Sequence, residues 1–178
     1  MPTHGYGPFR RFLLGSVTAK ALHDVECPVW TSAHKPEKPA PPAGYRNLLC
    51  AVDVWSNSLS LLRWASLFAC EQGATLKLLH AIPATKIPGA LGPEDGRFHT
   101  SLFDWARKEL RKLQEEAGTS LEIVVEGGDV AHVVHRVAEA SHCDLVVIGR
   151  GVIHELFGRM RTNVYSIIRE APCPVISV

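Results

Sequence analysis

The sequence predicts an α/β protein built on a parallel sheet of five strands, with helices on both faces. From Tyr45 onward, short continuous apolar runs alternate with longer amphipathic stretches. Apolar runs of about four to eight residues are typical of strands that are buried on both faces. In addition, a chain of 178 residues with 46% hydrophobic and 21% charged side chains suits one globular domain with an appendage.

Five apolar segments are expected to form the strands. They are LLCAV (48–52), TLKLLHAI (75–82), LEIVV (121–125), DLVVIG (144–149) and PVISV (174–178). In open parallel sheets, ligands bind beyond the carboxyl ends of the strands, near the point where the strand order reverses. Three places are therefore candidates for a site: Asp53 after the first strand, the segment after Ile82, and the loop that opens at Gly149.

Four helices are expected between these strands. The first follows Ser56-Asn57-Ser58, whose side chains offer helix caps, and it stops at Gly73. The second spans about 101–117, and its run of charged residues indicates a solvated face with local ion pairs. The third follows the turn at Gly127-Gly128-Asp129, and the last lies around 162–170.

The chain begins with a segment that repeats its own end. The matching pairs are Gly5 with Gly151, Ser16 with Thr162, and Cys27-Pro28-Val29 with Cys173-Pro174-Val175. The sequence thus predicts a partial C-terminal fragment of a domain over 1–33, a Pro-rich linker over 34–44 and a complete domain over 45–178. Either the chain is the second half of a tandem protein, or the fragment is a genuine shortened architecture.

Composition excludes several classes of function. Nineteen basic against 18 acidic residues give a net charge of +1, so neither a nucleic acid nor a membrane is expected as a partner. No stretch approaches the roughly 20 apolar residues that span a bilayer. The five cysteines include no CxxC pair, and we interpret them as reduced core thiols of a cytoplasmic protein.

Taken together, four motifs resemble the universal stress protein family. They are LLCAVDVWSNS, a V-x-x-G-D helix opening, DLVVIG followed by a glycine loop, and a closing CPV strand. The resemblance covers 45–178, with a second partial match over 1–33. It implies a doubly wound fold of the adenine nucleotide alpha hydrolase type with strand order 3-2-1-4-5. Many members of the family bind ATP, so the resemblance also implies ATP, with magnesium, as a possible ligand.

The resemblance also implies roles for particular residues. In ATP-binding members the aspartate after the first strand, here Asp53, contacts the adenosine. A glycine loop of the form G-x2-G-x9-G-[S/T] wraps the phosphates, because glycines let backbone N–H groups approach phosphate oxygens and a helix N-terminus adds a favourable field. The positions that correspond are Gly149, Gly151, Arg161 and Thr162 in the C-terminal copy, and Gly5, Gly15 and Ser16 in the N-terminal copy.

The glycine loop of the complete domain departs from this pattern. Only one residue separates Gly149 from Gly151, and Arg161 stands where the later glycine is expected. The side chain of Arg161 could fill the space for the phosphates. Alternatively, Arg150, Arg159 and Arg161 could hold phosphate by charge. The N-terminal copy keeps its Gly-Ser pair but lacks the aspartate strand.

Other residues carry weaker signals. His132 and His135 lie three apart on a predicted helix, but no third ligand at useful spacing is evident, so no metal site is predicted. His80 is interpreted as a partly buried histidine with satisfied hydrogen bonds, and Trp55 as a residue that could line a pocket. No nucleophile with a base is found, so no catalytic residue is predicted, and at most weak ATP hydrolysis is expected.

Two functional hypotheses remain open. The chain could be a stress-associated protein that binds or senses adenine nucleotides, or it could be an interaction module that has lost nucleotide binding. Family members commonly pair through their final strands, so the resemblance implies a homodimer. The segment ECPVW (26–30) could then lie along PVISV of the same chain, or of another chain by exchange of the N-terminal segment, and cover an exposed sheet edge.

Overall fold

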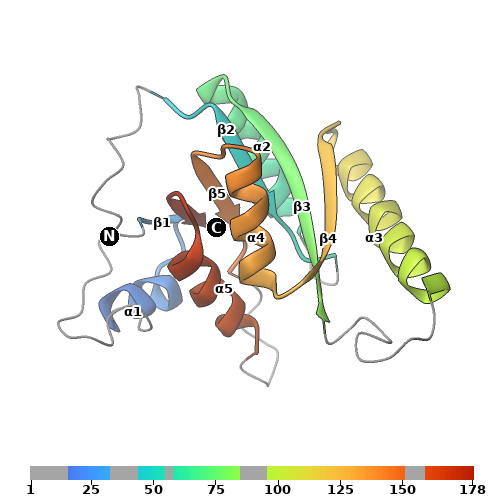
Figure 1. Cartoon of the computed structure of the whole chain (residues 1–178). Helices are drawn as coiled ribbons and strands as arrows, with labels where there is room; N and C mark the ends of the chain where they lie inside the picture. The colour runs from blue at the N-terminus through green and yellow to red at the C-terminus, as the bar shows by residue number, and fades with distance from the viewer. Residues whose placement is uncertain (1–15, 33–43, 55–57, 85–95, 151–158) are drawn as a thin grey trace.

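The apolar runs form the strands of one mixed sheet, with order β1-β6-β5-β2-β3-β4 (Figure 1). The structure, a computed structural model, describes residues 16–32, 44–54, 58–84, 96–150 and 159–178. Within its helices, the side chains at 16, 96–100 and 159–162 are not described. The strands are β1 (Val29–Thr31), β2 (Asn47–Ala51), β3 (Thr75–Pro83), β4 (Glu122–Gly128), β5 (Leu145–Ile148) and β6 (Val175–Ser177).

The strands from β2 to β6 all run parallel, and their order along the sheet is β4-β3-β2-β5-β6. Numbered along residues 45–178, this is the order 3-2-1-4-5, so the predicted doubly wound fold is confirmed. All four residues of β5 are buried, as are the three central residues of β2. Burial on both faces explains why these strands read as uninterrupted apolar runs.

The helices cover both faces of the sheet. They are α1 (Ser16–Asp24), α2 (Leu59–Gln72), α3 (Gly96–Ala117), α4 (Val130–Ala140) and α5 (Arg159–Glu170). Leu62 of α2 and Leu110 of α3 belong to the apolar core on one face, whereas Val134 of α4 and Ile168 of α5 belong to the core on the other. Figure 1 shows α4, α5 and α1 together on the second face.

Local signals fix most helix ends. Gly73 ends α2 in the left-handed conformation (φ 63°), and the carboxylate of Asp129 caps α4 by accepting a hydrogen bond from the backbone N–H of His132 at 3.1 Å. Ser58 occupies the N-cap position of α2 but makes no side-chain cap. Its hydroxyl donates instead to the backbone oxygen of Asp53 at 3.0 Å, so the predicted capping role is wrong for Ser58. Ser56 and Asn57 lie outside the described residues.

The N-terminal arm, which we define as residues 16–32, adds a sixth strand and a helix to the five parallel strands and their helices. β1 pairs antiparallel with β6 of the same chain, and this pair makes the sheet mixed rather than purely parallel. Leu22 of α1 and Val29 of β1 are both buried in the core beside α4 and α5. The arm is therefore part of the folded core.

The pairing of β1 with β6 has local two-fold symmetry. Trp30 lies opposite Ile176, its equivalent in the sequence repeat. The hydroxyl of Thr31 donates to the backbone oxygen of Val175 at 3.0 Å. Ser177 is the equivalent of Thr31 in the repeat, and its hydroxyl donates to the backbone oxygen of Val29 at 3.4 Å. Each repeat unit also places a helix before its strand, since α1 precedes β1 and α5 precedes β6. β1 and β6 therefore contact each other in the same way as two copies of one surface do in a symmetric, isologous dimer interface.

The cysteines are all free, and their burial divides them. Cys50, Cys143 and Cys173 are buried, as expected for core thiols, but Cys27 and Cys70 are exposed. The prediction of a core position is wrong for Cys70 because it lies on the solvent side of α2, and for Cys27 because it lies in the bend before β1. Among the described residues, no helix combines the length and the apolar character needed to cross a lipid bilayer.

Candidate functional site

The strand order reverses between β2 and β5. From β2 the chain proceeds to β3 and β4 on one side, whereas β5 and β6 lie on the other side. The last residue pair between β2 and β5 is Ala51 with Ile148. The next residues of both strands, Asp53 and Gly149 among them, therefore leave the sheet at the same carboxyl edge. Such a reversal is where ligands bind in doubly wound sheets.

The backbone that carries Asp53 is held from three directions. The N–H of Val52 donates to the backbone oxygen of Leu79 at 2.9 Å. The oxygen of Val52 accepts a hydrogen bond at 2.9 Å from Nδ1 of His80, a residue that is only 1% exposed. The hydroxyl of Ser58 binds the oxygen of Asp53 from the start of α2. Asp53 is thus presented, half-buried, from a fixed backbone. His80 makes a hydrogen bond as expected, but it is fully rather than partly buried.

Gly149 allows the end of β5 to lie close to α2. A Cβ atom at this position would come within 3.3 Å of Cδ2 of Leu61. That separation is slightly shorter than ordinary van der Waals contact, so the side chain of Leu61 would have to shift by a few tenths of an ångström to admit a larger residue. The small size of glycine thus suits the close packing of α2 against the end of β5. Packing of this kind is one of the roles that glycines play in phosphate-binding loops.

Arg150 connects the beginning of the glycine loop to the N-terminal arm. Its backbone N–H donates to the oxygen of Val178 at 3.0 Å. Its guanidinium donates to the backbone oxygens of Val25 and Cys27 in the arm, and at 3.2 Å to that of Ser177 in β6. These contacts show no phosphate-binding geometry for Arg150, because its donors point at backbone oxygens. If positive charge holds phosphate in place of the missing glycine, that charge would have to come from Arg159 and Arg161.

Several predicted site residues cannot be placed in full. Gly5, Gly15, Gly151 and Trp55 lie outside the described residues. Arg161 and Thr162 fall in the first turn of α5, and Ser16 opens α1, but their side chains are not described. The structure therefore brings together Asp53 and Gly149 from the predicted set and places the start of α5 after the loop. The roles of these residues remain predictions.

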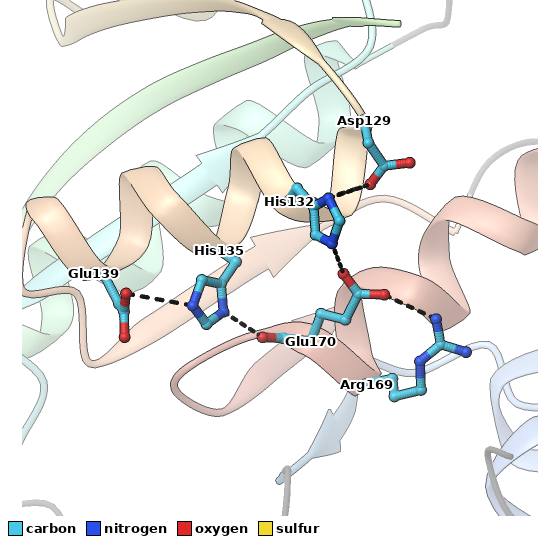
Figure 2. Close-up of polar contacts among 6 residues, drawn as sticks. All are labelled: Asp129, His132, His135, Glu139, Arg169 and Glu170. Carbon is cyan, nitrogen blue, oxygen red and sulfur yellow. Dashed lines mark hydrogen bonds and ion pairs between the residues drawn. The ribbon is translucent and has the colours of Figure 1, made fainter. Parts of the chain in front are cut away.

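A second cluster of polar side chains lies where α4 and α5 meet. The sequence singles out His132 and His135 but gives no sign of their partner Glu170, which belongs to another helix (Figure 2). The residues are 38 and 35 positions from Glu170 in the chain. No local spacing rule could have detected this contact.

The strand order defines a class, the doubly wound α/β proteins, whose ligands bind at the carboxyl edge where the order reverses. The universal stress protein family model matches residues 44–178, and the chain belongs to this family. Universal stress protein A homolog 1 of Coxiella burnetii is 28% identical over 140 residues, which cover 75% of this chain and 96% of the relative.

Solved structures show the same fold at lower identity. A Pseudomonas aeruginosa structure assigned to the universal stress proteins has a TM-score of 0.69 at 21% identity. The match covers 100% of this chain but 61% of that chain, so this chain spans about three fifths of its length. A universal stress protein in complex with cAMP has a TM-score of 0.53 at 18% identity, over 76% of this chain and 97% of that chain.

Proposed function

We propose that this universal stress protein binds an adenine nucleotide at the crevice between β2 and β5 and acts as a cytoplasmic, stress-associated nucleotide sensor. One observation carries the proposal: the register of β2 and β5 brings Asp53 and Gly149 to the same edge, where the strand order reverses. Membership of the family supports it. So does the cAMP complex of a protein with the same fold.

Each part of the crevice has a role in this proposal. The carboxylate of Asp53 would accept hydrogen bonds from the nucleoside, which places the adenosine beside β2. The phosphates would lie by the loop after Gly149 and the N-terminus of α5, where free N–H groups and the helix dipole favour an anion. The packing of Gly149 against Leu61 would keep the edge of β5 narrow enough for backbone contacts.

An aspartate variant tests this proposal. We expect Asp53→Asn to weaken ATP or cAMP binding about tenfold or more, because it removes a charge-assisted hydrogen-bond acceptor. Isothermal titration calorimetry with ATP, with ATP plus magnesium and with cAMP measures this. Asp104→Asn is the matched control, since Asp104 is exposed on α3 and pairs only locally with Arg107. The absence of binding heat at about millimolar nucleotide would contradict the proposal.

The alternative is an interaction module without a nucleotide, and the contacts of Arg150 favour it. A residue next to the expected phosphate loop donates to two backbone oxygens of the arm, and β1 already covers the edge of β6. In this alternative, two chains would form a homodimer through their final strands, with exchange of the arms.

Slow ATP turnover that disappears in Asp53→Ala would instead indicate a weak hydrolase.

A further inference from the structure

Three side chains with metal-binding atoms converge where α4 begins and α5 ends (Figure 2). Asp129 is the N-cap of α4, His132 lies in the first turn of that helix, and Glu170 is the last residue of α5. One ligand atom from each of the three lies within 4.8 Å of those of the other two. Nε2 of His132 is 3.4 Å from Oε2 of Glu170, whereas Oδ1 of Asp129 lies 3.9 Å from the other ring nitrogen, Nδ1.

These separations suit a shared cation. Zinc binds imidazole nitrogen and carboxylate oxygen at about 2.0–2.2 Å, so tetrahedral ligands lie about 3.4 Å apart. The contact between His132 and Glu170 already has this length. One ion binds one imidazole nitrogen, so with Nε2 and Glu170 as ligands the carboxylate of Asp129 must rotate from its place beside Nδ1 toward Nε2. The side chains of His132 and Asp129 are 79% and 66% exposed, so this rotation is not blocked by packing.

The neighbouring residues hold Glu170 in position. Arg169 pairs with Oε1 of Glu170 at 2.8 Å, while Oε2 faces His132. Nδ1 of His135 donates to the backbone oxygen of Glu170 at 2.6 Å, and its Nε2 faces Glu139 at 3.3 Å. His135 therefore supports the end of α5 and is not one of the three converging ligands. Outer contacts of this kind orient the ligands of metal sites.

We propose that Asp129, His132 and Glu170 bind a divalent transition-metal ion of the zinc class, with water in the remaining position. The donor set decides the class, because one imidazole and two carboxylates suit zinc and its neighbours, whereas magnesium and calcium prefer oxygen ligands alone. With three protein ligands, a tetrahedral ion keeps a fourth position that water fills and that another ligand can take by exchange. The ion would link the first turn of α4 to the last turn of α5, the helix that follows the glycine loop.

Calorimetric titration of the full chain with zinc alone tests the site. The chain should carry Cys27→Ser and Cys70→Ser, because exposed thiols compete for zinc. We expect one saturable site that weakens at least about tenfold in both His132→Gln and Asp129→Asn. Asparagine remains a good helix cap, so Asp129→Asn should fold even where another variant does not. We also expect saturating zinc to raise the unfolding temperature by about 3 °C or more.

The matched control is His23→Gln. His23 is an exposed histidine with its own carboxylate partner, Asp24, at 2.6 Å, so it measures zinc binding by ordinary surface pairs. Its loss should leave the affinity unchanged within about twofold. The proposal is overturned if the parent shows no saturable binding, or if His132→Gln and Asp129→Asn bind zinc as tightly as the parent.

Discussion

Burial determines which thiols of the chain can react. Burial raises the pKa of Cys50 to about 12. It also raises the pKa of Cys143 to about 11, an effect to which the charge of Asp144 adds and which Lys77 partly offsets. Since the thiolate is the reactive form, these two residues are protected in two ways. Burial keeps reagents away from them, and the raised pKa keeps their thiols protonated. Cys27 and Cys70 are exposed, so a reagent can reach both.

The thiol-specific reagent DTNB should therefore distinguish two classes at about pH 8. We expect Cys27 and Cys70 to react within minutes, and Cys50, Cys143 and Cys173 to react only on unfolding in denaturant. Absorbance of the released thiolate measures both phases. A Cys70→Ser variant should lose one equivalent from the fast phase and nothing from the slow one. Rapid reaction of all five thiols in the native protein would contradict the burial of the last three.

At the scale of single elements, helix ends depend on backbone conformation as much as on side chains. Gly73 ends α2 with φ 63° and ψ 29°, and its N–H donates to the oxygen of Cys70 at 3.1 Å. The next N–H, of Ala74, reaches the oxygen of Ala69 at 2.9 Å. A Cβ atom at Gly73 would meet nothing within 4 Å. Only the left-handed conformation, and not crowding, requires glycine there.

Gly73→Ala should consequently destabilise the protein by about 1 kcal/mol, since alanine is strained in the left-handed region. Gly73→Asn should lose less, because asparagine tolerates this conformation better. Urea unfolding followed by circular dichroism measures both free energies of unfolding. If alanine and asparagine were equally destabilising, the end of α2 would depend on something other than backbone conformation.

The sequence is sufficient to predict the parallel strands. Each of the five predicted segments has ends within three residues of those of the corresponding strand among β2, β3, β4, β5 and β6. The agreement is close because a strand that is buried on both faces has a continuous run of apolar residues. Helix starts are less well predicted. α3 begins at Gly96 rather than near 101, and α5 at Arg159 rather than near 162. The first turn of a helix needs no apolar face, so periodicity does not mark it.

The candidate site could be predicted only where it follows directly from strand ends. Asp53 and Gly149 lie at one edge because each directly follows a strand, and this is visible in the sequence. The contacts of Arg150 with the arm span 123 to 125 positions, and Glu170 is remote from His132 in the chain. Side-chain contacts between distant segments have no local signature. They emerge only from the folded chain.

At the scale of the whole molecule, the arm completes the sheet. Val29 and Leu22 enter the core, β1 covers the edge of β6, and Arg150 binds two backbone oxygens of the arm. An uncovered strand edge readily pairs with another chain. The two-fold relation between β1 and β6 favours a second β6 as the replacement, since the same surface would meet itself.

Deletion of residues 1–33 should accordingly produce self-association through the exposed β6, together with a lower unfolding temperature. Size-exclusion chromatography with light scattering measures the first effect, and differential scanning calorimetry the second. Arg150→Ala provides the graded control, since it removes the guanidinium contacts but leaves β1 in place. We expect it to speed hydrogen exchange in the arm without changing the oligomeric state. A truncated chain of unchanged mass and stability would count against a structural role for the arm.

The pairing of β1 with β6 also imposes an order of events on synthesis. Thr31 leaves the ribosome 144 residues before Val175, whose oxygen its buried hydroxyl binds. During that interval the arm has no strand to pair with, and β5 has no neighbour on its outer side. Contacts so distant in sequence are slow to form, because a long loop must close first. We therefore expect docking of the arm to be a late step of folding, because β1 can pair only after β6 has been made.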